Sequence, residues 1–193
     1  TMDSAPTISV VIPYHNEGEL VRNAIDSVGN EQLDGTLEVL VIDDQSTEKP
    51  VAEYVESRPN VRLLRTPESL HAAGTRNYGI QHATGEFVSF LDADDVYLPD
   101  RLAAHVSFLQ QHANVVMVGA SLYIHRPNER LHSPHVIEEK YPDLVDSRCV
   151  LPDSVRHDVC THFFFHTGTV TIRRTALEQI SGFDASFRWA AEW

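Results

Sequence analysis

Residues 87–95 read FVSFLDADD, an apolar run that ends in the three carboxylates of Asp92, Asp94 and Asp95. The apolar part is typical of a strand buried in a protein core. Several negative charges at the end of such a strand are costly unless a positive group meets them. Mg²⁺ or Mn²⁺ bound to a diphosphate would do so, because these ions prefer oxygen ligands and phosphates complete their coordination. The alternative is a surface turn, since Asp is common after strands and caps helices.

Strands and helices are predicted to alternate on both sides of this stretch. Apolar and β-branched runs predict strands at residues 8–12, 37–42, 61–64, 87–91 and 169–173, and Pro13 is expected to end the first. Apolar residues at helical spacing predict helices at residues 19–28, 51–56, 74–83, 99–111 and 175–180. This alternation predicts an α/β fold with a mostly parallel central sheet and helices on both of its faces.

Three polar clusters follow predicted strands, at residues 13–17, 43–47 and 92–95. In a parallel sheet covered on both faces, ligands bind beyond the carboxyl ends of the strands. The three clusters are therefore expected to lie together in one site. Residues 126–159 are rich in Pro, His and charge. They predict a long irregular excursion, of the kind that more often faces a substrate than forms core.

The composition is that of a soluble globular protein that does not bind nucleic acid. The 193 residues suit one domain with a substantial core, and 42% of them are hydrophobic and 22% charged. The net charge of −13 disfavours nucleic acid, whose phosphates attract clustered Lys and Arg. No apolar run approaches the roughly 20 residues of a membrane-spanning helix. Two cysteines, Cys149 and Cys160, do not form a disulfide framework, which favours a reducing, cytoplasmic setting.

Four motifs in order resemble those of family 2 glycosyltransferases. They read VIPYHNE at 11–17, VIDDQST at 41–47, RNYG at 76–79 and FLDADD at 90–95, and GFD at 182–184 with Phe187 extends the likeness to the end of the chain. The resemblance implies the GT-A nucleotide-diphospho-sugar transferase fold over residues 1–193, as one domain cut short at its C-terminal end. It also implies transfer of a sugar from a nucleotide-diphosphate donor to an acceptor hydroxyl, with inversion and with Mn²⁺ or Mg²⁺.

By this resemblance, the first two motifs bind the nucleoside. The loop with Pro13, His15 and Glu17 holds the base, and the His15 ring stacks on it. Asp44 accepts a hydrogen bond from the edge of uracil or guanine. Taken without the resemblance, the first loop only leads into a helix with Asn16 as its N-cap. Asp44 then belongs to a turn whose side chains bond to nearby backbone.

The other two motifs are implied to bind the diphosphate and the metal. Arg76, near the start of its helix, contacts the diphosphate or the base, with a solvated surface arginine as the alternative. Asp92 contacts the ribose or supports the site, and Ala93 lies between the two acids. Asp94 binds the metal and Asp95 joins it, so that the ion bridges the phosphates and neutralises the leaving diphosphate.

Inverting transfer needs a general base near the sugar, and Glu192 is the candidate. The family places this base second in a Glu-Asp pair that a Trp usually follows, and Ala191, Glu192 and Trp193 stand at the matching positions. Glu replaces the usual Asp, which moves the carboxylate outward by one methylene, and Ala191 replaces the first acid. The alternative is a plain surface glutamate.

A second metal pattern occurs at residues 157–166, where His157, Cys160, His162 and His166 have the residue types of zinc ligands. Their spacing fits no common zinc pattern, and the three phenylalanines at 163–165 instead indicate a core or pocket wall. His166 leads into the last predicted strand, which makes it a candidate for the acceptor side of the site.

Two rival functions stay open. A catalytically silent nucleotide-sugar-binding module of the same fold is favoured by Ala191, whereas a sugar nucleotidyltransferase needs a glycine-rich, basic loop that residues 13–17 lack. The expected partners are a UDP-, GDP- or dTDP-linked sugar and a saccharide, lipid or other hydroxyl acceptor of cell-envelope polysaccharide biosynthesis. The expected location is cytoplasmic, at most peripheral at the inner face of the membrane, with membrane contact only through a missing C-terminal region.

Overall fold

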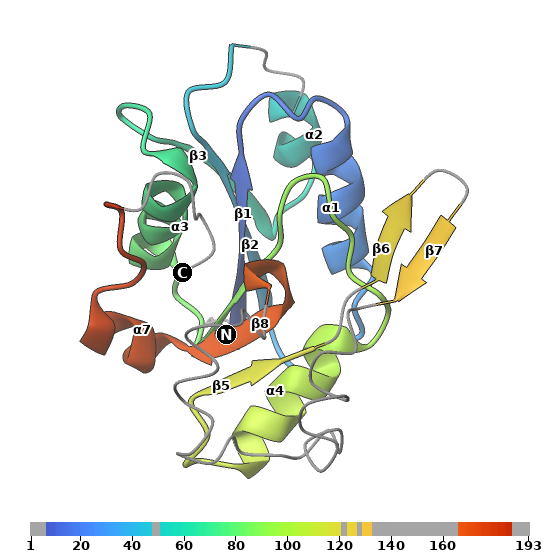
Figure 1. Cartoon of the computed structure of the whole chain (residues 1–193), viewed down its shortest axis with the longest axis vertical. Coiled ribbons are helices and arrows are strands. Elements are labelled where there is room, and N and C mark those ends of the chain that lie inside the picture. The colour runs from blue at the N-terminus through green and yellow to red at the C-terminus, as the bar shows by residue number, and fades with distance from the viewer. Residues whose placement is uncertain (1–6, 48–50, 121–122, 127–128, 133–165, 187–193) are drawn as a thin grey trace.

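The centre of the computed structural model is a six-stranded sheet (Figure 1). The structure describes residues 7–47, 51–120, 123–126, 129–132 and 166–186. Across the sheet the strand order is β3-β2-β1-β4-β8-β5. The strands are β1 (Ile8–Tyr14), β2 (Leu37–Asp43), β3 (Val61–Arg65), β4 (Phe87–Phe90), β5 (Met117–Gly119) and β8 (Val170–Arg173), and a separate hairpin consists of β6 (Tyr123–Arg126) and β7 (Glu129–His132).

Most of the described helices connect one strand of this sheet to the next along the chain, and the last follows β8. The described helices are α1 (Leu20–Gly29), α2 (Ala52–Glu56), α3 (His71–His82), α4 (Arg101–Gln111) and α7 (Arg174–Ile180), and a short 3-10 turn at Thr167–Thr169 leads into β8. β1 pairs in parallel with β2 and β4, and β2 pairs in parallel with β3. β8 runs antiparallel to both β4 and β5. The predicted α/β fold with a mostly parallel sheet is therefore confirmed.

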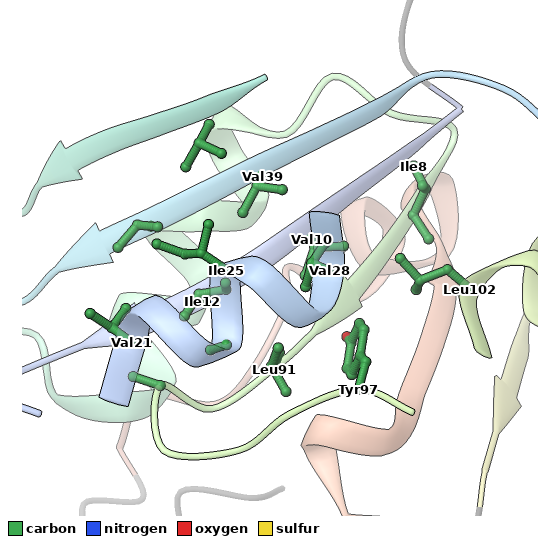
Figure 2. Packing of buried hydrophobic residues seen from close by; sticks show 14 of the residues in the cluster. Ile8, Val10, Ile12, Val21, Ile25, Val28, Val39, Leu91, Tyr97 and Leu102 are labelled. Carbon is green, nitrogen blue, oxygen red and sulfur yellow. The ribbon is translucent and has the colours of Figure 1, made fainter. Parts of the chain in front are cut away.

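Side chains of β1 alternate between the two faces of the sheet, so each face has its own core. Ile8, Val10 and Ile12 pack on the face that α1 and α4 cover, as Figure 2 shows for α1. Val11 points to the other face, where it joins a second buried cluster with Ile80 of α3 and a residue of α7. Burial on both faces explains why β1 reads as a continuous apolar run.

Helix α3 lies close to the sheet because Gly79 faces β1. A Cβ at position 79 would lie 2.4 Å from Val11 Cγ1 and 3.3 Å from Ile42 Cγ1, so a larger residue would displace the helix. The close approach fixes the position of α3, which also carries Arg76, against the ends of β1 and β2.

The first strand does not end at Pro13 as predicted. β1 continues to Tyr14, and Pro13 pairs with Ile42 of β2. The ladder between β1 and β4 ends at Val11 and Phe90. Because successive residues alternate their N–H groups between the two neighbours, the N–H that Pro13 lacks lies on the side where the ladder has already ended. A proline is tolerated at this position of the strand.

Two helices begin two or three residues away from their predicted starts, and distant acids cap both of them. α3 begins at His71, and not at residue 74, since the Asp44 carboxylate accepts the N–H of Leu70 at 2.7 Å and that of His71 at 3.0 Å. α4 begins at Arg101, and not at residue 99, where Glu31 accepts backbone N–H groups of the first turn. Neither acid is near its helix in the sequence.

The chain between β5 and β8 is described only in part. The β6–β7 hairpin shows regular structure where an irregular excursion was expected to begin, and the rest of residues 126–159 lies outside the described residues. Among the described helices, none combines the length and the apolar character that crossing a bilayer requires.

Candidate functional site

A pocket of about 550 Å³ lies at the carboxyl ends of β1, β2 and β4, where the three polar clusters meet as predicted. All the residues predicted to bind the nucleotide sugar line it, namely Pro13, His15, Glu17, Asp44, Arg76, Asp92, Ala93 and Asp94. The sequence interpretation missed five further lining residues, Tyr14, Ser69, His71, Ala72 and Thr75. Ser69, His71 and Ala72 precede the predicted helix at residues 74–83, and Thr75 lies in its first turn.

Hydrogen bonds hold the loops after β1 and β2 together. The N–H of Thr47 donates to Asn16 Oδ1 at 2.9 Å, and the amide nitrogen of Asn16 faces His15 Nε2 at 3.3 Å. His15 Nδ1 lies 2.6 Å from the carbonyl oxygen of Asp44. A carbonyl oxygen only accepts, so Nδ1 carries the proton and Nε2 accepts from Asn16. The exposed His15 ring is therefore held in one orientation and one tautomer at the pocket.

The buried carboxylate of Asp44 accepts hydrogen bonds at both oxygens. Oδ1 accepts from Thr66 Oγ1 at 3.0 Å and from the N–H of Leu70 at 2.7 Å. Oδ2 accepts from Ser69 Oγ at 3.2 Å and from the N–H of His71 at 3.0 Å. These donors occupy the usual acceptor directions of a carboxylate. Asp44 thus shapes the pocket wall at residues 66–71.

Arg76 and Asp92 form an ion pair in the pocket. Arg76 Nη2 lies 2.6 Å from Asp92 Oδ1, and the side chains are 4% and 24% exposed. A buried ion pair stabilises a fold little more than apolar residues of the same size. Its place in a pocket therefore points to a ligand, because a desolvated guanidinium binds anions strongly through charge-assisted hydrogen bonds.

Asp92 also belongs to a group that has the donor atoms of a metal site. One ligand atom each of Asp92, Asp95 and His166 lies within 4.8 Å of the others. Burial raises the pKa of the Asp95 carboxyl, the nearby charges of Asp94 and Asp92 raise the pKa further, and His166 acts in the opposite direction. A divalent cation relieves this repulsion, and two carboxylates with one imidazole suit Mn²⁺.

This group overlaps only partly with the predicted metal ligands. Asp95 was predicted and is a member, whereas Asp94 lines the pocket and does not belong to the group. His166, considered from the sequence for a zinc cluster or for the acceptor side, completes it. The remaining residues of the zinc pattern lie outside the described residues, namely His157, Cys160 and His162.

The sequence profile of glycosyl transferase family 2 matches residues 9–181. The chain belongs to this family. AmsB, an amylovoran biosynthesis glycosyltransferase of Erwinia amylovora, is 36% identical over 110 residues, which are 54% of this chain and 36% of AmsB. WfgD of Escherichia coli, a UDP-Glc:alpha-D-GlcNAc-diphosphoundecaprenol beta-1,3-glucosyltransferase, is 31% identical over 115 residues, which are 58% of this chain and 44% of WfgD. The chain spans less than half the length of these relatives.

Solved structures confirm the GT-A fold that the motifs imply. The mannosyltransferase PcManGT from Pyrobaculum calidifontis, solved in complex with GDP-Man and Mn²⁺, superposes with a TM-score of 0.64 at 24% identity. The match covers 95% of this chain and 49% of PcManGT. At this identity the likeness establishes the fold alone.

The general base expected of a family 2 glycosyltransferase lies beyond the part of the chain that the structure describes. Glu192 falls within residues 187–193, so its assignment stays a prediction. The last described residues before it are Ala185 and Ser186, which come directly after the turn at 182–184.

Proposed function

We propose that the protein is a metal-dependent inverting glycosyltransferase, which moves a sugar from a nucleotide-diphosphate sugar to an acceptor hydroxyl at this pocket. One observation carries the proposal. The carboxylate of Asp92 is shared between the ion pair with Arg76 and the group that Asp95 and His166 complete. Asp92 therefore connects a guanidinium that would bind a diphosphate with the residues that would hold a cation.

Different residues of the pocket bind different parts of the nucleotide-sugar donor. Asp92, Asp95 and His166 would hold Mn²⁺ or Mg²⁺, which when bound supplies the Lewis acid that neutralises the leaving diphosphate. Arg76 binds the diphosphate directly, and Asp92 orients its guanidinium. Asp94, which is exposed in the same pocket, faces the donor as a further metal ligand or as an acceptor for its hydroxyl groups.

The loops at the other end of the pocket take the nucleoside. His15 offers a ring fixed in one orientation for stacking on the base, within the loop that Pro13 and Glu17 also form. Asp44 keeps the wall at residues 66–71 in place and presents carboxylate oxygens to the base edge. UDP, GDP and dTDP are all compatible with this arrangement. WfgD is named for UDP-Glc, and PcManGT was solved with GDP-Man.

Glu192 is the proposed general base. Its carboxylate accepts the proton of the acceptor hydroxyl while the new bond to the sugar carbon forms and the bond to the diphosphate breaks. The names of AmsB and WfgD state amylovoran biosynthesis and a diphosphoundecaprenol-linked acceptor. We therefore propose a saccharide or lipid-linked saccharide acceptor of cell-envelope polysaccharide synthesis, used at the inner face of the membrane.

Calorimetric titration with UDP, GDP and dTDP, each with Mn²⁺ and with EDTA, tests the proposal. We expect one nucleotide to bind in the presence of Mn²⁺ and to lose most of its affinity in EDTA, because the cation that Asp92, Asp95 and His166 would hold would supply positive charge for the phosphates. A folded chain that binds none of the three nucleotides would contradict the proposal. Release of nucleoside diphosphate from a nucleotide sugar then separates the enzyme from a silent binding module, and release of pyrophosphate would indicate a nucleotidyltransferase.

A further inference from the structure

Asn77, the neighbour of Arg76 in α3, is bonded to a turn that lies 106 residues further along the chain. Its amide nitrogen donates to the carbonyl oxygen of Phe183 at 2.8 Å. Its Oδ1 accepts the N–H of the same residue, also at 2.8 Å. Because the two bonds go to the N–H and the carbonyl oxygen of one residue, the side chain of Asn77 fixes both the position and the orientation of this turn. The two bonds need one donor and one acceptor on the same side chain, which the amide of Asn77 supplies.

The residue before Phe183 is shaped to fit the same contact. Gly182 has a φ of +77°, which disfavours any residue with a side chain, and a Cβ there would lie 2.3 Å from Asn77 Oδ1. Its N–H donates to the carbonyl oxygen of Leu177 at 2.9 Å and so ends α7. The turn at 182–184 therefore lies so close to α3 that there is no room for a side chain at position 182.

The ring of Phe183 ties the turn to a second element of the site. It packs edge-on against Phe90, with 5.2 Å between the ring centroids and an angle of 81° between the planes. Phe90 is the last residue of β4, two positions before Asp92. The turn is thus fastened to α3 next to Arg76 and to β4 next to Asp92, the two partners of the ion pair in the pocket.

We propose that Asn77 is a positioning residue. It fixes the turn at 182–184 to the helix that binds the diphosphate, and so sets the point from which the chain enters residues 187–193, where the candidate base Glu192 lies. The inference rests on the proposed function in one respect, the role of Glu192. If Asn77 only held α7 and α3 together, replacing it would lower the stability of the protein, and donor binding and turnover would fall together.

The sequence provides a local probe for this proposal. The two tryptophans of the chain, Trp189 and Trp193, both belong to residues 187–193, so tryptophan emission reports on that stretch alone. Asn77→Ala removes both bonds to Phe183, and Asn77→Asp keeps the acceptor and loses the donor. Gln81→Ala is the matched control, since Gln81 is an exposed amide of the same helix.

We expect acrylamide quenching of the tryptophans to change in Asn77→Ala, to change less in Asn77→Asp, and to stay at the wild-type value in Gln81→Ala. Affinity for the nucleotide and Mn²⁺ should stay within about twofold of wild type, because Asn77 does not line the pocket. In the turnover assay, kcat should fall roughly tenfold to hundredfold with KM for the donor little changed, since a small displacement of a base has effects of this order.

Tryptophan quenching identical to wild type in folded Asn77→Ala and Asn77→Asp would overturn the proposal. So would a loss of nucleotide affinity that matches the loss of turnover. Should Asn77→Ala fail to fold, Gly182→Ala serves in its place, because its Cβ pushes against Asn77 Oδ1 and should change quenching in the same way. Quenching is measured without ligand, so it decides the positioning role even if wild type binds no nucleotide, a result that would contradict the proposed function instead.

Discussion

Replacing Arg76 by Met should nearly abolish nucleotide binding while the protein still folds. Met keeps most of the apolar stem and removes the charge that we propose binds the diphosphate. Hydrogen bonds to charged groups contribute about 1.5–3 kcal/mol each, so losing two phosphate contacts raises Kd by roughly a hundredfold or more. The free energy of unfolding should fall by about 1–3 kcal/mol, less than for a fully buried pair, because Asp92 is 24% exposed. Calorimetry and urea unfolding measure the two effects.

Arg65→Met is the matched control for this change. Arg65 forms an ion pair with Asp43 at 2.6 Å, the same N–O distance as in the Arg76 pair, but its side chain is 40% exposed and does not line the pocket. Its partner Asp43 is only 8% exposed, so we expect a loss of about 1–3 kcal/mol of stability, similar to that of Arg76→Met, and no change in nucleotide affinity. If Arg76→Met kept the nucleotide affinity of wild type, or if both variants lost nucleotide affinity equally, Arg76 would not belong to the donor site.

Replacing Asp95 by Asn should abolish metal-dependent nucleotide binding and yet stabilise the metal-free protein. Burial, and then Asp94 and Asp92, raise the pKa of the Asp95 carboxyl, so the folded protein disfavours its ionised form. The metal-free protein therefore loses stability as pH rises from the usual aspartate pKa through the raised pKa of Asp95. Asn carries no charge, so the melting temperature of the variant should exceed that of wild type at neutral pH.

The gain in stability from Asp95→Asn should disappear below the usual aspartate pKa, where the wild-type carboxyl is protonated in both the folded and the unfolded state. Thermal unfolding in EDTA between acid and neutral pH measures this dependence. Asp94→Asn provides the comparison, since Asp94 is the neighbouring acid outside the metal group. A larger loss of Mn²⁺ affinity in Asp94→Asn than in Asp95→Asn would make Asp94 the main ligand. A lower melting temperature for Asp95→Asn at neutral pH would contradict the electrostatic argument.

The layout of the fold was predictable because local patterns dictate it. The strands buried on both faces, such as β1 and β2, consist of continuous apolar runs, and helical spacing marks α1 and α4. The meeting of the polar clusters in one pocket followed from a general property of parallel sheets, that strand ends share an edge. Each of these features is encoded within a few neighbouring residues.

The features that the sequence interpretation missed depend on residues far apart in the chain. The start of α3 depends on Asp44, whose carboxylate caps it from another loop, and no residue near position 71 signals this. His166 lies near Asp95 because β8 runs antiparallel to β4. The apolar pattern of β8 does not indicate the direction in which the strand runs. The bonds between Asn77 and Phe183 depend on the same chain path.

The most direct test of the donor site is a crystal structure of the protein with Mn²⁺ and the nucleoside diphosphate that the protein binds. Anomalous scattering locates the metal. We predict one manganese peak bounded by the side chains of Asp92, Asp95 and His166, with the phosphates between it and Arg76. Manganese or nucleotide bound on another face of the molecule, with the ion pair of Arg76 and Asp92 left untouched, would contradict the account.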